Sequence, residues 1–282
     1  MKDIESAVAR HYGGTDLLAR IFAGLDAVGA DRNRLRTDDL AAVDEFHIGG
    51  REATTHAVAK MALAAGQHVL DIGCGLGGAA RYMAAQFGCK VTGIDLTPEF
   101  IAVANTLTEL TGLQDKAAFE VASAIAMPFE DQAFDAAITL HVAMNIPQRA
   151  ALYAETARVM KPGAILAIFD VMKKSDEDLV YPVPWAGSAG TSHLTTPEEM
   201  RTLLGEAGFE VGEVEDRTDF AVEFFKQRLA AAADGPPPLG IHLIMGADAP
   251  AKLKNVLRNI EAGRIAPVQM ISVRVSVQGE LE

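Results

Sequence analysis

The sequence predicts an α/β fold organised around a parallel β-sheet, and three observations carry this prediction. First, an apolar run at residues 69–72 ends in a glycine cluster, and a helical pattern follows over residues 79–87. Second, an apolar run at residues 91–94 ends in Asp95, just before a helix led by Pro98. Third, strand and helix patterns keep alternating as far as Asp170. The first two segments form a βαβ unit with an acidic residue at the tip of its second strand.

The segment before the first strand is predicted to be helical. Helical periodicity is present over residues 4–11, 16–25 and 54–63, and pairs of glycines separate these stretches. Ligands bind at the open end of an α/β sheet. We therefore expect residues 1–60 to form a helical cap that covers a ligand cleft.

The elements after Asp95 continue the same pattern. An apolar run over residues 134–140 suits a strand covered on both faces, and it ends in His141. We also expect helices at 99–110 and 150–160, and strands at 119–122 and 164–169, the last of these ending in Asp170. In a parallel sheet, His141 and Asp170 then lie at the ligand-binding edge.

The last third of the chain is predicted to add a lid and to complete the sheet. Residues 173–196 are rich in charged residues, proline, glycine, serine and threonine, which indicates an insertion. Thr196 followed by Pro197 predicts a helix start. Further helices are expected at 220–233 and 251–261, and further strands at 209–214 and 267–277.

The glycine cluster indicates a nucleoside ligand. Gly73, Gly75 and Gly77 permit a sharp turn that brings a ligand against backbone N–H groups, and Asp95 is placed to accept hydrogen bonds from a ribose diol. Gly73, Gly75 and Gly78 also satisfy the dinucleotide pattern G-x-G-x-x-G. Asp71 would repel a pyrophosphate but can attract an ammonium group, which disfavours a nicotinamide-dependent oxidoreductase.

The segment Leu-Asp-Ile-Gly-Cys-Gly-Leu-Gly at residues 70–77 resembles motif I of the class I S-adenosylmethionine (SAM)-dependent methyltransferases. This resemblance implies a Rossmann-like sheet of six parallel strands and one antiparallel edge strand, formed by the last strand. It also implies SAM as the cofactor. The residues that it assigns to the cofactor are Tyr12, Asp71, Gly73, Gly75, Gly77, Asp95, Leu96, Ser123, Ala124 and His141. Ser123 stands where the family usually has an aspartate for the adenine amino group, so backbone atoms at Ser123 and Ala124 are expected to contribute more.

Several segments outside motif I resemble the methyltransferases related to sarcosine/dimethylglycine N-methyltransferases. These are residues 46–54, 141–146, the Pro-Val-Pro-Trp run at 182–185, and 263–265. The resemblance implies methyl transfer to a nitrogen or oxygen atom of a small molecule. It divides the chain into a helical cap (1–60), a SAM-binding core (61–174), and lid insertions that complete the same domain (175–282). A non-catalytic SAM-binding or sensor protein is the alternative.

Several residues are candidates for handling the acceptor. A carboxylate acceptor would require an arginine, and Arg51 is the candidate by position; an apolar acceptor would suit Phe46, Met144 and Trp185. His47 follows Phe46 next to a glycine turn and is expected to face the cleft. For a hydroxyl acceptor, His141 is the candidate base, with Asp170 to orient it, as proposed for the equivalent pair in related O-methyltransferases.

Composition limits the partners. The net charge is −13 and there is no run of basic residues, which disfavours nucleic acid and anionic membrane surfaces. Cys74 and Cys89 are the only cysteines, and no metal-binding cluster or membrane-length apolar run is visible. We expect a cytoplasmic monomer or homodimer that acts on a small molecule without a metal.

Overall fold

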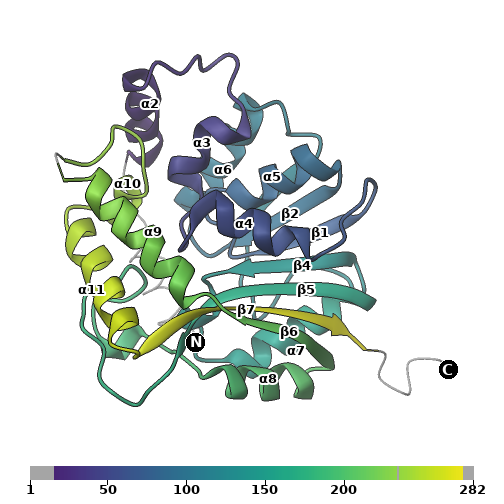
Figure 1. Ribbon diagram of the computed structural model, residues 1–282. Coiled ribbons are helices and arrows are strands. Elements are labelled where there is room, and N and C mark those ends of the chain that lie inside the picture. The colour runs from purple at the N-terminus through teal and green to yellow at the C-terminus, as the bar shows by residue number, and fades with distance from the viewer. Residues whose placement is uncertain (1–15, 234, 276–282) are drawn as a thin grey trace.

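A seven-stranded β-sheet with helices on both faces forms the centre of the molecule (Figure 1). The computed structural model describes residues 16–233 and 235–275. The strand order is β3-β2-β1-β4-β5-β7-β6. The strands are β1 (His68–Ile72), β2 (Lys90–Asp95), β3 (Ala117–Val121), β4 (Phe134–Leu140), β5 (Met160–Lys173), β6 (Phe209–Asp216) and β7 (Ile265–Arg274). Strands β1 to β5 pair in parallel, so the predicted βαβ unit and α/β class are confirmed.

The position of the antiparallel strand corrects the sequence prediction. Strand β7 is antiparallel, as expected, but it lies between β5 and β6 rather than at the sheet edge. Most of β7 is buried, whereas β6 is largely exposed. The apolar, doubly covered strand therefore occupies the inner position, and β6 forms the edge.

The helices that pack on the two faces follow from the alternation of side chains along the strands. On one face, Val69 and Val91 pack against α4 (Gly50–Ala59), α5 (Gly78–Phe87) and α6 (Pro98–Leu110). On the other face, Leu70 and Ile168 pack against α7 (Arg149–Val159) and α8 (Pro197–Glu206). The predicted start of α8 is confirmed, because Thr196 and Glu199 form a reciprocal capping box there.

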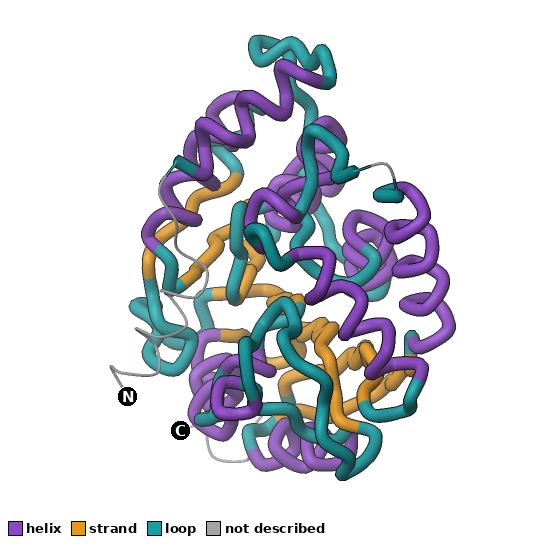
Figure 2. The backbone as a smooth tube through the Cα atoms, turned by 90° about the vertical axis from the view of Figure 1, so that its left-hand side faces the viewer, coloured by secondary structure: helices purple, strands orange, loops and turns teal. Residues whose placement is uncertain are grey.

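A further group of helices lies beyond the carboxyl ends of the parallel strands (Figures 1 and 2). It consists of α2 (Leu17–Ala27), α3 (Thr37–Asp44), α9 (Thr218–Ala231), α10 (His242–Met245) and α11 (Ala249–Glu261). Leu239, from the segment before α10, packs into the apolar cluster of α2 around Leu17, Ile21 and Leu25. Segments more than 200 residues apart therefore meet above the sheet. Of the described helices, none has the length and apolar character that a membrane crossing needs.

The N-terminal helices differ in part from the prediction. Helix α3 was not predicted, because its sequence Thr-Asp-Asp-Leu-Ala-Ala-Val-Asp has only two large apolar residues. Helix α4 begins at Gly50 rather than at residue 54, because Gly49 adopts a left-handed conformation (φ 88°) and leads directly into the helix. The helix expected over residues 4–11 and the candidate residue Tyr12 lie outside the described residues.

Candidate active site

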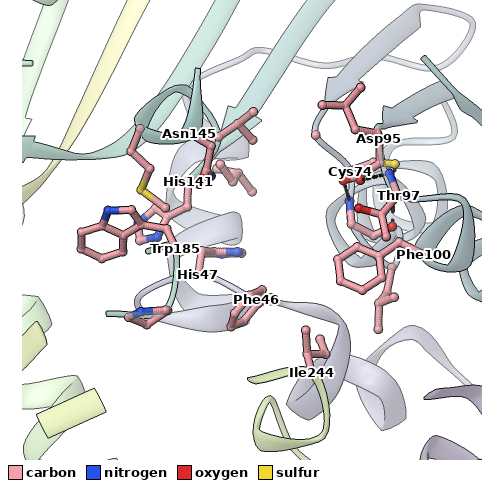
Figure 3. Close-up of a pocket in the computed structure, with 18 of the residues that line it drawn as sticks. Phe46, His47, Cys74, Asp95, Thr97, Phe100, His141, Asn145, Trp185 and Ile244 are labelled. Carbon is pink, nitrogen blue, oxygen red and sulfur yellow. Dashed lines mark hydrogen bonds between the residues drawn. The ribbon is translucent and has the colours of Figure 1, made fainter. Parts of the chain in front are cut away.

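A deep cavity opens at the carboxyl ends of β1, β2 and β4 (Figure 3). Its empty space amounts to about 1580 Å³ when the open solvent at its mouth is included. Figure 3 shows two groups of side chains in its lining. Asp95, Cys74, Thr97 and Phe100 form one group, which we call the turn end. His47, His141, Asn145 and Trp185 form the other, which we call the histidine end.

The glycine turn shapes the turn end of the cavity. Gly73 and Gly75 both have positive φ angles, 73° and 54°, which glycine adopts without steric cost. A Cβ on Gly73 would lie 2.3 Å from the side chain of Val142, so this glycine allows the loop after β4 to approach. Apart from its two chain neighbours, none of the described residues has an atom within 4 Å of a Cβ built on Gly75, and Gly75 lines the cavity. The turn therefore leaves space for a ligand at Gly75.

Asp95 is held ready for a ligand at the tip of β2. One carboxylate oxygen accepts a hydrogen bond from the Gly75 N–H at 3.1 Å, and the other accepts from the Thr97 N–H at 2.8 Å. Burial raises the pKa of Asp95, and these backbone donors oppose that shift. Each oxygen keeps further acceptor capacity. The carboxylate can therefore accept hydrogen bonds from two adjacent hydroxyl groups, as a ribose diol requires.

Two buried carboxylates next to the turn suit a cationic group. One oxygen of Asp71 accepts from the Ala80 N–H, whereas Asp71 Oδ2 has no hydrogen-bond partner in the described part of the chain. Burial raises the pKa of Asp71 to about 7. Asp44, at the end of α3, pairs through Oδ2 with Arg81 at 2.7 Å, and its Oδ1 likewise finds no partner among these residues. Buried anionic oxygens without donors are costly, and an ammonium group would offset that cost.

Asp44 was not among the predicted site residues, and its position depends on Gly78. A Cβ on Gly78 would lie 2.4 Å from the Asp44 backbone oxygen, so only glycine lets α3 lie over the turn. Gly78, which completed the apparent dinucleotide pattern, thus allows the helical cap to pack on the turn. Gly77 also packs rather than lining the cavity: its Cβ would meet the Phe119 ring at 2.6 Å. A contact between Gly77 and the cofactor stays a prediction.

The remaining predicted cofactor residues lie on the cavity wall. Leu96, Ser123 and Ala124 all line it, and so does Ile125, which the sequence did not single out. The Ser123 hydroxyl accepts from the Ile125 N–H at 3.4 Å. A role for Ser123 and Ala124 in binding adenine stays a prediction.

The histidine end of the cavity is mostly apolar. Phe46, Met144 and Trp185, the candidates for an apolar acceptor, line the cavity, and Trp185 is fixed by a hydrogen bond from its Nε1 to the Ser192 hydroxyl at 2.9 Å. Residues of the C-terminal helices that sequence reasoning missed also contribute to the cavity wall: Phe224, Phe225, Ile241, Ile244, Met245, Leu253 and Val256. No local motif marks these residues, because they come from separate helices.

Arg51 does not line the cavity, contrary to expectation. Its Nε lies 2.5 Å from Glu45 Oε1 and its Nη1 lies 2.8 Å from Asp38 Oδ1. Its guanidinium also lies 4.8 Å from the centre of the Tyr82 ring. These contacts pair Arg51 with other residues of the cap rather than with the cavity.

His141 and Asp170 do not form the expected pair. His141 packs its ring against Phe169 at a centroid distance of 5.0 Å. Successive side chains of a strand point to opposite faces, so Asp170 faces away from His141. Its carboxylate instead accepts hydrogen bonds from the backbone N–H groups of Val171, Met144 and Ala143. Asp170 thus anchors the short helix η1 (Ala143–Asn145), and it is absent from the cavity wall.

Both histidines of the cavity are uncharged at neutral pH. Burial lowers the pKa of His47 to about 4. Burial also lowers the pKa of His141 well below its usual range, and the neighbouring His47 lowers it further. The two rings lie 6.0 Å apart in an edge-on arrangement. The histidine end therefore presents neutral imidazoles within an apolar wall.

Comparison with known proteins identifies the class. A methyltransferase domain family matches residues 70–168. The O-methyltransferase resE of Aspergillus sclerotiorum is 30% identical over 210 residues, which cover 73% of this chain and 76% of that protein. The chain belongs to the class I SAM-dependent methyltransferases, and SAM is its cofactor.

Two further relatives match a smaller share of their own length. Methyltransferase GfsG of Streptomyces halstedii is 29% identical over 63% of this chain and 65% of that protein. Phosphoethanolamine N-methyltransferase 1 of Arabidopsis thaliana is 33% identical over 64% of this chain but only 36% of that protein. The relatives thus include both O- and N-methyltransferases.

Solved structures share the fold. Geranyl diphosphate C-methyltransferase of Streptomyces coelicolor has a TM-score of 0.72 at 16% identity, covering 96% of this chain and 98% of that one. A proposed sarcosine dimethylglycine methyltransferase from Galdieria sulphuraria has a TM-score of 0.67 at 19% identity, covering 79% and 85%. At these identities the likeness concerns the fold alone.

Proposed function

We propose that this protein transfers the methyl group of SAM to a hydroxyl oxygen of an uncharged, largely apolar small molecule. The observation that carries this proposal is the histidine end of the cavity, where neutral His47 and His141 interrupt a wall formed by residues such as Phe46, Met144 and Trp185. SAM supplies a methyl group on a sulfonium centre. At the turn end, Asp95 is suited to hold its ribose, and the buried carboxylates of Asp44 and Asp71 complement its ammonium group.

The polarity of the histidine end distinguishes classes of acceptor. An apolar wall gains free energy by burying apolar surface, roughly 25 cal/mol per Å². An acceptor with a carboxylate or phosphate would need a compensating cation, and Arg51 is already paired with Glu45 and Asp38. A hydroxyl group, in contrast, can donate its hydrogen to a neutral imidazole. These features favour an apolar alcohol or phenol over an amino acid or a phosphorylated amine.

Product detection by mass spectrometry tests this proposal. The wild-type protein is incubated with SAM and either 1-naphthol, 1-naphthylamine, sarcosine, dimethylglycine or phosphoethanolamine. We expect the methyl ether of 1-naphthol, and the same reaction with Asp95→Ala serves as the control for a contaminating activity. Methylation of sarcosine or phosphoethanolamine without methylation of 1-naphthol would contradict the proposed acceptor class while leaving the methyltransferase class intact.

A further inference from the structure

The environment of His47 fixes which of its ring nitrogens carries the proton. His47 Nε2 lies 3.1 Å from the Gly50 carbonyl oxygen and 3.1 Å from the Thr54 hydroxyl oxygen. A carbonyl oxygen can only accept a hydrogen bond, so Nε2 is the donor and bears the hydrogen. In the neutral ring, Nδ1 then carries the free lone pair. His47 lines the cavity, so Nδ1 is the nitrogen left for a ligand.

The carboxylate of Glu45 lies on the Nε2 side of the His47 ring. The Thr54 hydroxyl donates to Glu45 Oε2 at 2.6 Å, so its oxygen can accept from His47 Nε2–H, whose one hydrogen is then shared between Thr54 and the Gly50 carbonyl. Glu45 Oε2 itself lies 3.7 Å from His47 Nε2. The other oxygen of Glu45 is fixed by Arg51 at 2.5 Å. Glu45, Thr54 and His47 therefore form a buried carboxylate–hydroxyl–imidazole chain that ends at the cavity.

We propose that His47 is the general base of the reaction, accepting the proton of the acceptor hydroxyl at Nδ1, with Thr54 and Glu45 as positioning residues. This inference rests on the proposed function. It assigns to His47 the role that the sequence suggested for His141. Asp170, which was expected to orient His141, lies on the opposite face of the sheet.

The proton transfer balances the methyl transfer. The acceptor oxygen forms its bond to the methyl carbon, and the carbon–sulfur bond breaks with its electron pair on sulfur. The hydroxyl proton passes to His47 Nδ1, and the O–H electron pair stays on oxygen. The products are S-adenosylhomocysteine, the methyl ether and a protonated His47, which returns its proton to solvent. The positive charge thus moves from sulfur to the imidazolium, where Glu45 stabilises it.

The low basicity of His47 suits this step. The hydroxyl oxygen becomes strongly acidic as its new bond forms, because it would otherwise bear a positive charge, so even a weak base accepts its proton. A neutral ring also avoids repulsion with the sulfonium before the reaction. Because burial lowers the pKa of His47 to about 4, the ring is neutral throughout the physiological range.

Kinetics with acceptors of different acidity test the inference. His47→Gln keeps a side-chain N–H for the Gly50 carbonyl but has no base in place of Nδ1. With 1-naphthol, general base catalysis typically contributes at least ~100-fold, so we expect kcat to fall by about that factor while the Kd for SAM stays constant. With 4-nitrophenol at pH 8.5, which is ionised and needs no base, the loss should be less than about tenfold.

The positioning residues have matched variants. Thr54→Val removes the hydroxyl at constant size and should lower kcat for 1-naphthol by about tenfold, and Thr54→Ser should restore it. His141→Gln provides the comparison with the other ring. A purely structural role for His47 would lower turnover of 1-naphthol and 4-nitrophenol equally, and that result would overturn the inference, as would a larger loss in His141→Gln than in His47→Gln.

A measurement without any acceptor provides a second test. Nitrogen-15 NMR of the full-length protein with labelled histidines should show His47, assigned by the loss of its signals in His47→Gln, as the Nε2–H tautomer that stays neutral down to about pH 5. An Nδ1–H tautomer would overturn the inference. Failure of the wild-type protein to methylate any hydroxyl probe would instead count against the proposed function, so the two failures are distinguishable.

Discussion

The turn end and the histidine end of the cavity are built in different ways. At the turn end, Asp71, Gly75 and Asp95 lie within 25 residues of one another, and their hydrogen bonds run to backbone N–H groups. At the histidine end, His47, His141 and Trp185 come from three distant segments, and they are held by packing together with hydrogen bonds that involve their side chains. Backbone geometry thus shapes the proposed site for SAM, the cofactor that the class shares. Side chains on separate loops and helices shape the proposed acceptor site, and they can change without disturbing the glycine turn.

The largest expected effect on the turn end comes from removing the carboxylate of Asp95. Asp95→Ala should weaken SAM binding on the order of 100-fold or more, because it removes two hydrogen bonds to a charged acceptor, each worth roughly 1.5–3 kcal/mol. Isothermal titration calorimetry with SAM measures this directly. Glu120→Ala, an exposed acidic residue on the neighbouring strand β3, is the matched control and should leave the affinity unchanged. Equal affinities in the two variants would remove Asp95 from the cofactor site.

Substitutions of Gly75 and Gly77 should separate effects on SAM binding from effects on stability within the glycine turn. Gly77→Ala should lower the free energy of unfolding by about 1–3 kcal/mol, because its Cβ would overlap the Phe119 ring. The Cβ of Gly75→Ala would overlap none of the residues that the structure describes, so this variant should cost only about 1 kcal/mol for its positive φ. Its Cβ would instead occupy space at the cavity, so SAM affinity should fall by about tenfold. Thermal melts and SAM titrations should therefore rank the two variants in opposite orders.

Substitutions at the histidine end should change the KM for the acceptor and leave SAM binding intact. Trp185→Leu removes part of the aromatic wall and should raise the KM for an apolar acceptor such as 1-naphthol by about tenfold, the free energy of a few buried CH₂ groups. The Kd for SAM should remain the same. Ser192→Ala, which removes only the hydrogen-bond partner of Trp185 Nε1, should have a smaller effect on KM. A parallel loss of SAM affinity in Trp185→Leu would show that the two ends are not independent.

The same difference explains how much the sequence could predict. The strands β1, β2 and β4, the glycine turn and the positions of Asp71 and Asp95 followed from local patterns, because each depends on neighbours close in sequence. Helix α3 and Asp44 were missed, since the only signal was Gly78, whose meaning depends on a segment that precedes it by 34 residues. A glycine pattern alone does not distinguish close ligand approach from close packing.

The acceptor side was harder to predict for a further physical reason. Arg51 and Asp170 carry the charges that catalysis or recognition could use, but both have structural partners that only the fold brings together. The direction of Asp170 depends on strand register, since a shift by one residue would turn it toward His141. His47 was expected at the cleft, and it lines the cavity. Its partners Thr54 and Glu45 could not be inferred, because their contacts depend on the turn through Gly49 and Gly50.

The smallest expected effect concerns the pH dependence of the two ends. Burial, with further contributions from Glu45 and Asp95, raises the pKa of Asp71 to about 7, while the Ala80 N–H and Arg81 oppose the rise. A cationic ligand favours the ionised carboxylate, so SAM binding should release a proton and strengthen as pH rises. Between pH 6 and pH 8 the affinity should increase by at most about tenfold and then level off.

Calorimetry in two buffers of different ionisation enthalpy measures the proton release. The ionisation of SAM itself affects its binding to the wild-type protein and to Asp71→Asn alike. The difference between the two pH profiles of SAM affinity therefore reports the ionisation of Asp71. The histidine end should contribute nothing in this range, because His47 remains neutral well below pH 6. A pH dependence of SAM affinity that is as large in Asp71→Asn as in the wild-type protein would place the titrating group elsewhere.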